Sequence, residues 1–267
     1  MPTRCGTRSA GLLCRAAWVA PVANPSQTLG LWRSLAIYYA PGRLRRLRRF
    51  YGPLIQPGDL CFDVGAHVGN RVAAWASLGA RVVAVEPQAH LMAWLQRRYG
   101  SAPQVTLIEA AVGAAEGKAT LRLDPLNPTV ASLSPDWIAT VGRDAAFSRV
   151  RWRAAEPVRL TTLDALIATH GRPALCKIDV EGFEAEVLRG LSQPLPLVSF
   201  EYLPATITVA HACLEQLAAL GEYEFNWFPG ESHRWASPVW LDMPAMTAQL
   251  DTLAAGRASG DIFARGR

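Results

Sequence analysis

The stretch FDVGAHVGN at residues 62–70 decides the fold of this chain, together with VEP at residues 85–87. An apolar run over residues 60–64 is typical of a buried parallel strand, and a glycine-punctuated turn follows it. The sequence then predicts a helix over residues 71–78 and a second apolar strand over residues 81–85, which Glu86 ends. These segments indicate one strand–turn–helix–strand unit with a carboxylate at the tip of its second strand.

The residue types of this unit favour a nucleoside ligand without a phosphate group. Glycines let the backbone approach a ligand closely, and a carboxylate at the tip of the second strand can accept hydrogen bonds from a ribose diol. The turn reads D-x-G-x-x-x-G instead of the G-x-G-x-x-G of dinucleotide sites, and the acid before it favours an amine or a cation. We therefore expect S-adenosylmethionine; the alternative is an ordinary α/β turn without a ligand. The candidate donor-binding residues are Asp63, Gly65, Ala66, Gly69, Asn70, Glu86, Pro87 and Glu109.

Length and charge indicate one substantial domain with a basic extension at its start. The chain has 267 residues, enough for one α/β domain. Residues 1–50 hold nine arginines and no acidic residue, so the remaining chain carries 18 basic and 22 acidic residues. We therefore expect a basic extension over residues 1–50, weakly ordered over residues 1–28, and a domain over residues 51–267. Five scattered cysteines without a C-x-x-C pair indicate reduced thiols, a cytoplasmic setting and no cysteine-based metal cluster.

The end of the basic extension predicts two helices, over residues 29–39 and 43–50. The second helix is rich in arginine, with Leu44, Leu47 and Tyr51 along one stripe. The simplest interpretation is a solvated helix packed on the edge of the domain, and the alternative is contact with an acidic membrane surface or another anionic partner. Nucleic acid is not expected, because no aromatic–basic interleaving supports it. No run of 18 apolar residues exists, so no transmembrane helix is expected.

A second block, LCKIDVEG at residues 175–182, places several charged residues at one edge of the same sheet. It predicts a strand in which Lys177 and Asp179 point to one side, with Glu181 in the following turn. A further strand over residues 197–202 contains Glu201. Open α/β sheets bind ligands at the carboxyl ends of their strands, so these four residues are the candidate catalytic residues. The alternative is a structural ion-pair network in which Lys177 neutralises Asp179 or Glu201.

Strands alternate with helices along the rest of the chain, which predicts a doubly wound, mostly parallel sheet. The third strand is expected over residues 105–109, and helices are expected over residues 90–99, 162–167 and 184–191. Residues 124–157 lack periodicity and predict an insertion on the substrate side, with a helix near residues 134–141. Residues 221–228 and 260–265 predict an antiparallel C-terminal edge. Four tryptophans in these regions could stack on sugar faces or pack against the sheet: Trp137, Trp152, Trp235 and Trp240.

The runs FDVGAHVGN, VEP, TTLDALI, KIDVEGFEAEVLRGL and SFEY follow one another over about residues 58–203. In this the chain resembles the FkbM family of S-adenosylmethionine-dependent methyltransferases. The resemblance implies a class I Rossmann-like fold and O-methylation of a sugar, a glycan or a secondary metabolite. It implies that Asp63, Gly65 and Gly69 belong to the donor-binding loop and that Glu86 binds the ribose. It also implies that Lys177, Asp179 and Glu181 lie near the site of transfer.

Methyl transfer to a hydroxyl benefits from a general base, because an alcohol is a poor nucleophile until its proton leaves. Asp179 is the first candidate, followed by Glu181 and Glu201, and Lys177 could orient the base. We expect a metal-free site acting on a small-molecule or glycan acceptor. In the alternative, Asp179, Glu181 and Glu201 hold a divalent cation. Two other classes of protein stay open: a non-catalytic partner-binding module and an NAD(P)-dependent oxidoreductase.

Overall fold

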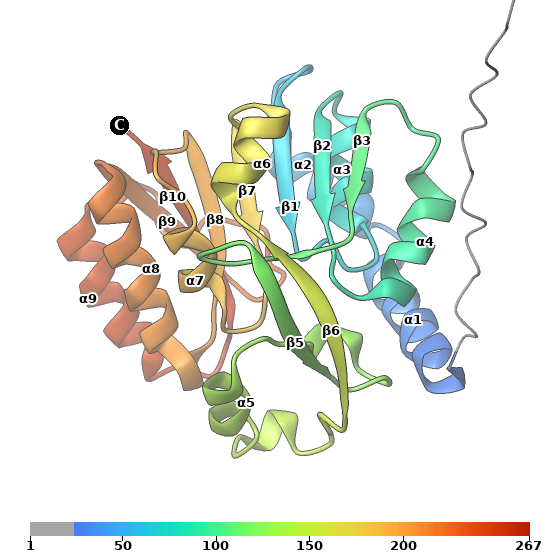
Figure 1. Ribbon diagram of the computed structural model, residues 1–267. Coiled ribbons are helices and arrows are strands. Elements are labelled where there is room, and N and C mark those ends of the chain that lie inside the picture. The colour runs from blue at the N-terminus through green and yellow to red at the C-terminus, as the bar shows by residue number, and fades with distance from the viewer. Residues whose placement is uncertain (1–23) are drawn as a thin grey trace, which may run out of the picture.

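A seven-stranded sheet forms the centre of the molecule (Figure 1). The structure is a computed structural model that describes residues 24–267, and what the sequence predicts for residues 1–23 lies outside this range. The strand order is β3-β2-β1-β7-β8-β10-β9, and β10 runs antiparallel to both of its neighbours. The strands are β1 (Leu60–Val64), β2 (Arg81–Val85), β3 (Val105–Ile108), β7 (Leu175–Ile178), β8 (Leu197–Tyr202), β9 (Tyr223–Pro229) and β10 (Gly260–Gly266). The predicted parallel sheet with an antiparallel C-terminal edge is confirmed.

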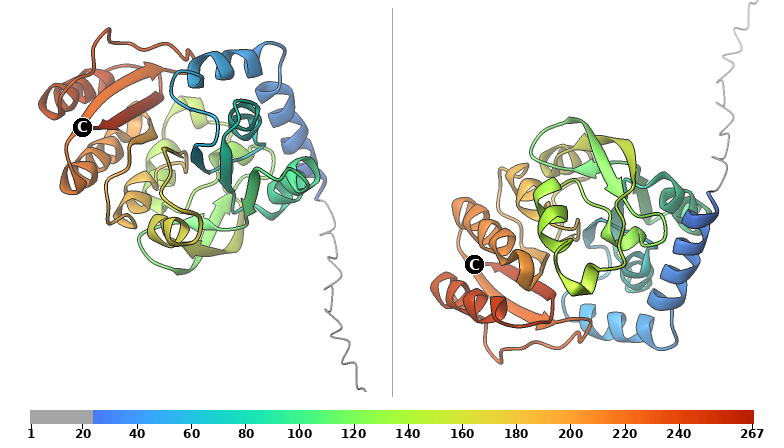
Figure 2. Two further views of the ribbon diagram at one scale, coloured as in Figure 1. Left: turned by 90° about the horizontal axis from the view of Figure 1, so that it is seen from above. Right: turned by 90° about the horizontal axis from the view of Figure 1, so that it is seen from below.

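Helices cover both faces of this sheet, which is therefore the middle of three layers (Figure 2). One face packs against α2 (Arg43–Tyr51), α3 (Asn70–Ser77) and α4 (Ala89–Tyr99). The other face packs against α6 (Leu163–His170), α7 (Glu184–Arg189), α8 (Ile207–Leu220) and α9 (Met243–Ala254). Successive strand residues point to opposite faces, so Cys61 and Phe62 enter different cores. Burial on both sides explains why the central strands are apolar runs and not alternating patterns.

A second sheet of three strands lies beyond the carboxyl ends of the parallel strands (Figure 1). Its order is β4-β6-β5, with β4 at Ala111–Val112, β5 at Gly117–Leu123 and β6 at Ala154–Thr161. Between β5 and β6 the chain forms the short helices η1 (Pro128–Val130), α5 (Pro135–Val141) and η2 (Ala145–Phe147). The helix near residues 134–141 is confirmed, and the Ser134 side chain caps it by accepting from the Trp137 amide. Strand β6 was not predicted from the sequence, because Pro157 interrupts the alternation of residues that is typical of a strand.

Two helices, α1 (Pro25–Tyr38) and α2, precede the sheet and run along the outside of the molecule (Figure 2). Helix α1 begins four residues before the predicted position, because Asn24 caps it by accepting from the Ser26 amide at 3.0 Å. The expectation that residues 1–28 are weakly ordered is therefore wrong for residues 25–28. Helix α2 buries Leu47 and Tyr51 of its predicted stripe on its inner side, whereas Leu44 is exposed. Among residues 24–267, every helix is too short or too polar to cross a bilayer.

Candidate active site

A cavity opens at the carboxyl ends of β1, β2, β7 and β8, where the two sheets face each other. Its empty volume is about 930 Å³, counting the part that is open to solvent. The predicted residues that line this cavity are Gly65, Asn70, Glu86, Pro87, Asp179, Glu181 and Glu201. The structure therefore brings together most of both predicted groups, although at least 92 positions of the chain separate them, counted from Pro87 to Asp179. Ligand sites of α/β folds lie in this position relative to the strands.

Glu86 is buried at the tip of β2 and presents a carboxylate to the cavity. Its Oε2 accepts from the His67 amide at 2.8 Å, and its Oε1 accepts from the Gln88 amide at 2.9 Å. Burial raises the pKa of Glu86 to about 7, although these hydrogen bonds oppose the rise. Each oxygen keeps further acceptor capacity, because a carboxylate offers about four lone-pair sites. Glu86 is thus fixed in place and can still accept from a bound diol.

The glycines of the turn are required first by packing against the protein itself. Gly65 has a φ of +83°, and a Cβ at this position would lie 1.9 Å from the Asp179 carbonyl oxygen. Gly69 has a φ of +79°, and a Cβ there would lie 2.7 Å from the Leu95 side chain. Gly65 lines the cavity, whereas Gly69 faces α4 instead. A close approach to the ligand therefore explains at most one of the two glycines.

Gln88 supplies a polar atom that fits a nucleoside ligand, and sequence analysis did not single it out. Its side-chain amide donates to the Pro128 carbonyl at 2.9 Å, which fixes the orientation of the group. Its Oε1 is buried and has no hydrogen-bond partner within residues 24–267. Because Gln88 lines the cavity beside Glu86, this oxygen can accept from a ligand hydroxyl or amine. The hydrogen-bond acceptors at this end of the cavity therefore suit a ribose-bearing cofactor.

Three other predicted donor-binding residues lie behind the cavity wall, and Glu109 lies outside it. Asp63 and Ala66 are fully buried and do not line the cavity. Glu109 is exposed, because β3 ends at Ile108 and the chain turns away there. Ala110, Ala111 and Val112 line the cavity in its place. The geometry therefore does not support direct contacts to the methyl donor from Asp63, Ala66, Gly69 and Glu109.

Asp63 acts instead through Arg71, which lines the cavity at the start of α3. The Arg71 Nε donates to Asp63 Oδ1 at 2.9 Å, and its Nη2 forms an ion pair with Asp179 Oδ2 at 2.9 Å. Burial raises the pKa of Asp63, and the adjacent guanidinium opposes that rise. One arginine thus connects the end of β1 to the end of β7.

Lys177 is fully buried behind Asp179, and its main partner is Asp261 on β10. Its Nζ donates to Asp261 Oδ1 at 2.8 Å and lies 3.9 Å from Asp179 Oδ2. Burial alone would lower the pKa of Lys177, but the charges of Asp261 and Asp179 outweigh it and raise the pKa. The predicted ion pair with Asp179 is thus present at longer range, while Asp261 was missed. A buried lysine signals that an acidic partner is needed, but not where that partner lies.

The turn that presents Glu181 is held from three sides. Glu184 Oε1 accepts from the Val180 amide at 3.1 Å and from the Gly182 amide at 3.3 Å. The Ser132 hydroxyl donates to the Glu181 carbonyl at 2.6 Å. A Cβ on Gly182 would lie 2.1 Å from Trp137, so that this indole covers the turn. Helix α7 and the segment between β5 and β6 therefore fix a turn in which Glu181 itself has a φ of +53°.

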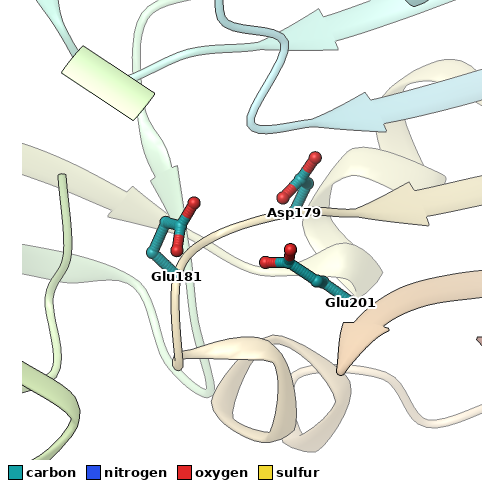
Figure 3. A group of neighbouring side chains, drawn as sticks. All are labelled: Asp179, Glu181 and Glu201. Carbon is teal, nitrogen blue, oxygen red and sulfur yellow. The ribbon is translucent and has the colours of Figure 1, made fainter. Parts of the chain in front are cut away.

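Asp179, Glu181 and Glu201 point toward one another at the cavity (Figure 3). Burial would raise the pKa of Asp179, but Lys177 and Arg71 outweigh it and lower the pKa. Burial, followed by the charges of neighbouring carboxylates, raises the pKa of Glu181 and of Glu201 well above the ordinary value. The three offer oxygen atoms within 4.8 Å of one another, and such oxygens can hold a divalent cation. Without a cation, Asp179 loses its proton more readily than Glu181 and Glu201 do.

The tryptophans considered for sugar stacking pack against other aromatic rings and are absent from the lining of the cavity. The ring centroids of Trp137 and Trp152 lie 6.1 Å apart, in the segment between β5 and β6. The ring centroid of Trp235 lies 5.1 Å from that of Phe263 and 5.3 Å from that of Trp240. Tyr38 from α1 and Glu231 after β9 line the cavity instead. Neither could be found from the sequence, because both come from segments outside the motifs.

Comparison with known proteins places the matched region over this site. A family model described as Methyltransferase FkbM domain matches residues 63–212. A TehB-like S-adenosylmethionine-dependent methyltransferase from Corynebacterium glutamicum is 13% identical, with 91% of this chain and 100% of that chain covered and a TM-score of 0.47. The O-methyltransferase TomG from Streptomyces achromogenes is 9% identical, with 91% and 90% covered and a TM-score of 0.41. No curated protein matches the chain.

Proposed function

Because this chain belongs to the FkbM methyltransferase family, we propose that it methylates a hydroxyl group of a sugar, a glycan or a secondary metabolite. Its fold is that of class I methyltransferases, and its cofactor is S-adenosylmethionine. The observation that carries the proposal is the group of Asp179, Glu181 and Glu201 at a cavity that Glu86 also lines. Donor-binding groups and proton acceptors thus meet in one space.

Glu86 and Gln88 hold the nucleoside part of the donor. Both are fixed by hydrogen bonds within the protein, and both keep acceptor capacity toward the cavity. Hydrogen bonds to a charged acceptor contribute about 1.5–3 kcal/mol, so Glu86 should dominate donor affinity. When bound, S-adenosylmethionine supplies the methyl group on its sulfonium sulfur.

Glu181 takes the proton of the acceptor hydroxyl. The sequence ranks Asp179 first for this role, but two cations beside Asp179 lower its pKa and so weaken it as a base. Glu181 has no side-chain hydrogen bond within residues 24–267, and its pKa is raised. A raised pKa makes the ionised carboxylate of Glu181 a stronger base than that of Asp179. Asp179 then accepts a hydrogen bond from another hydroxyl of the substrate and so orients it, with Glu201 as an alternative base for the reacting hydroxyl.

Lys177 positions Asp179 without reaching the acceptor, because it is fully buried. Its charge and that of Arg71 keep Asp179 ionised beside two other carboxylates. Holding the acceptor in this way can account for a large part of the rate, since orientation alone contributes up to about 7–11 kcal/mol.

The test is incubation of the purified chain with methyl-labelled S-adenosylmethionine and a panel of glycans, sugars and hydroxylated secondary metabolites. Label should appear as an O-methyl ether on one class of acceptor and should be lost in Glu181→Gln. Calorimetry separates the other classes of protein. A chain that binds NAD(P) in preference to the donor would be an oxidoreductase, and a chain that binds neither would be a partner-binding module.

A further inference from the structure

Helix α1 exposes its large apolar side chains and buries small ones. Gly30 and Ser34 form the buried side, whereas Leu29 and Trp32 are 62% and 63% exposed and Ile37 is 42% exposed. A helix on a globular domain normally turns its large apolar residues inward. The outer side of α1 is therefore apolar surface that the described part of the chain does not cover.

This orientation of α1 is fixed by contacts on its inner side. A Cβ on Gly30 would lie 2.4 Å from the Pro125 carbonyl oxygen, so only glycine permits this distance from the η1 segment. Gln27 donates to Glu156 at 3.1 Å, and Arg33 donates to Asn127. Rotation that buried Trp32 would break these contacts. The exposed apolar side is thus a fixed feature of the fold.

Exposed apolar residues are concentrated at this place. Among residues 24–267, six large apolar side chains are exposed, and Leu29, Trp32, Ile37 and Leu44 lie on α1 and α2. A fifth, Leu126, follows the residue that Gly30 contacts. Only Val239 lies elsewhere. Contiguous apolar patches of this kind mark interaction sites, whereas scattered single residues do not.

Positive charge lies on α2, the helix next to this patch. Helix α2 meets α1 at a corner on the outside of the molecule (Figure 2), and its outer side carries Arg45, Arg48 and Arg49, all exposed. Residues 24–58 contain six arginines and no acidic residue. Within the described range, Arg43 and Arg46 contact Glu231, whereas the three outer arginines form no ion pair.

We propose that the corner formed by α1 and α2 docks on the surface of an anionic lipid bilayer. Leu29 and Trp32 enter the boundary between headgroups and acyl chains, and Arg45, Arg48 and Arg49 contact the lipid phosphates. An apolar helix side flanked by cations is typical of interfacial helices, and tryptophan is enriched at that depth. Basic residues near an anionic leaflet add attraction that a neutral surface would not provide. Helix α1 also contributes Tyr38 to the cavity, so docking of α1 on the bilayer would place the active site beside the membrane.

The full chain should co-sediment with vesicles of phosphatidylcholine and phosphatidylglycerol, and much less with phosphatidylcholine alone. Raising the salt concentration should weaken this binding, because exposed charges are screened. Arg45→Gln/Arg48→Gln/Arg49→Gln should weaken it on the order of fivefold for each charge removed. The matched control, Arg143→Gln/Arg149→Gln/Arg257→Gln, removes the same charge from other exposed sites and should have little effect.

Leu29→Ser/Trp32→Ser tests the apolar part independently of charge. Binding should fall by at least about tenfold, whereas Val239→Ser should bind like the wild type. Circular dichroism and turnover on a soluble acceptor should stay unchanged, since both side chains point away from the cavity. Equal binding of all variants would overturn the proposal. So would a dimer in sedimentation velocity that Leu29→Ser/Trp32→Ser dissociates, or duplex DNA that binds the chain more tightly than anionic vesicles do.

Discussion

At the scale of single residues, neighbouring carboxylates in this site differ in whether they keep a charge or take up a proton. Asp179 lies beside Arg71 and Lys177, which lower its pKa. Glu181 lies within reach of Glu201 and Asp179, and their charges add to the effect of burial in raising its pKa. Pairs of titratable groups whose environments separate their pKa values indicate acid–base roles. This difference is the reason for proposing that Asp179 orients the acceptor and that Glu181 receives the proton.

Glu181→Gln should lower turnover by about 10²–10⁴, the usual effect of losing a general base, while donor binding survives. In the wild type the rate should fall as the pH drops through the raised pKa of Glu181, and this dependence should disappear in the variant. Asp179→Asn should mainly raise the KM for the acceptor and keep the pH dependence. Measured pH profiles of both variants decide the assignment. If Asp179→Asn abolishes the profile and Glu181→Gln keeps it, Asp179 is the base.

Glu86→Ala should weaken S-adenosylmethionine binding by about 1.5–3 kcal/mol, because an ionised hydrogen-bond acceptor is lost. Burial raises the pKa of Glu86 to about 7, so the group is ionised above that pH and protonated below it. Wild-type affinity should therefore decrease as the pH falls through about 7, and the variant should lack this part of the dependence. Calorimetry over a pH series measures both effects. Glu109→Ala, at an exposed position, is the control and should bind normally.

Chelation of metals should leave turnover unchanged if Glu181 receives the proton directly. The three carboxylates have oxygen atoms close enough to bind Mg²⁺ or Ca²⁺, so the measurement is informative. Turnover is followed after treatment with EDTA and again after adding back Mg²⁺. Loss of activity that Mg²⁺ restores would make Asp179, Glu181 and Glu201 metal ligands, and Glu181→Gln would then also weaken metal binding.

At the scale of elements, the sequence predicts what local periodicity controls and misses what pairing over long distances controls. The apolar runs of β1, β2 and β7 are predictable because burial on both faces requires them. Strand β6 is not, since its half-buried pattern with Pro157 is stabilised by pairing with β5. Asp261 likewise reaches Lys177 only because β10 pairs with β8, in a register that sets Asp261 opposite Glu201. Lys177 and Asp261 are 84 positions apart in the chain, and no local sequence signal indicates that their strands lie close together in the sheet.

Asp261→Asn should destabilise the fold by about 3 kcal/mol or more, because it leaves a buried lysine without its closest counter-charge. Lys177 has no exposed surface and Asp261 has 18%, so solvent cannot replace the lost partner. The free energy of unfolding is measured by chemical denaturation. Glu224→Gln, which removes a partly exposed carboxylate paired with the exposed Arg265 and Arg267, is the control and should change it less. Equal effects of the two substitutions would show that Lys177 is stabilised by Asp179 alone.

At the scale of the whole molecule, the cavity is closed by parts of the chain outside the central sheet. Tyr38 comes from α1, Thr129 and Leu133 come from the segment between β5 and β6, and Glu231 comes from the loop after β9. The proposed donor-binding residues Glu86 and Gln88 lie within residues 63–212, which the family model matches. The acceptor end combines segments from the start, middle and end of the chain. We therefore predict that acceptor choice depends on how these segments dock.

Docking of α1 is the contact that Gly30 controls most directly. In Gly30→Leu, the new Cβ would lie 2.4 Å from a backbone oxygen and 3.0 Å from Pro128, so α1 must move away from η1. Unfolding free energy should fall by about 1–3 kcal/mol, the usual cost of overpacking. Turnover should fall as well, because Tyr38 leaves the cavity. Hydrogen exchange should become faster over residues 25–38 and stay unchanged in β1 and β2. The control is Ala36→Leu on the exposed side of the same helix, which should preserve turnover. Normal turnover in Gly30→Leu, together with fast exchange in α1, would show that the acceptor site forms without this helix.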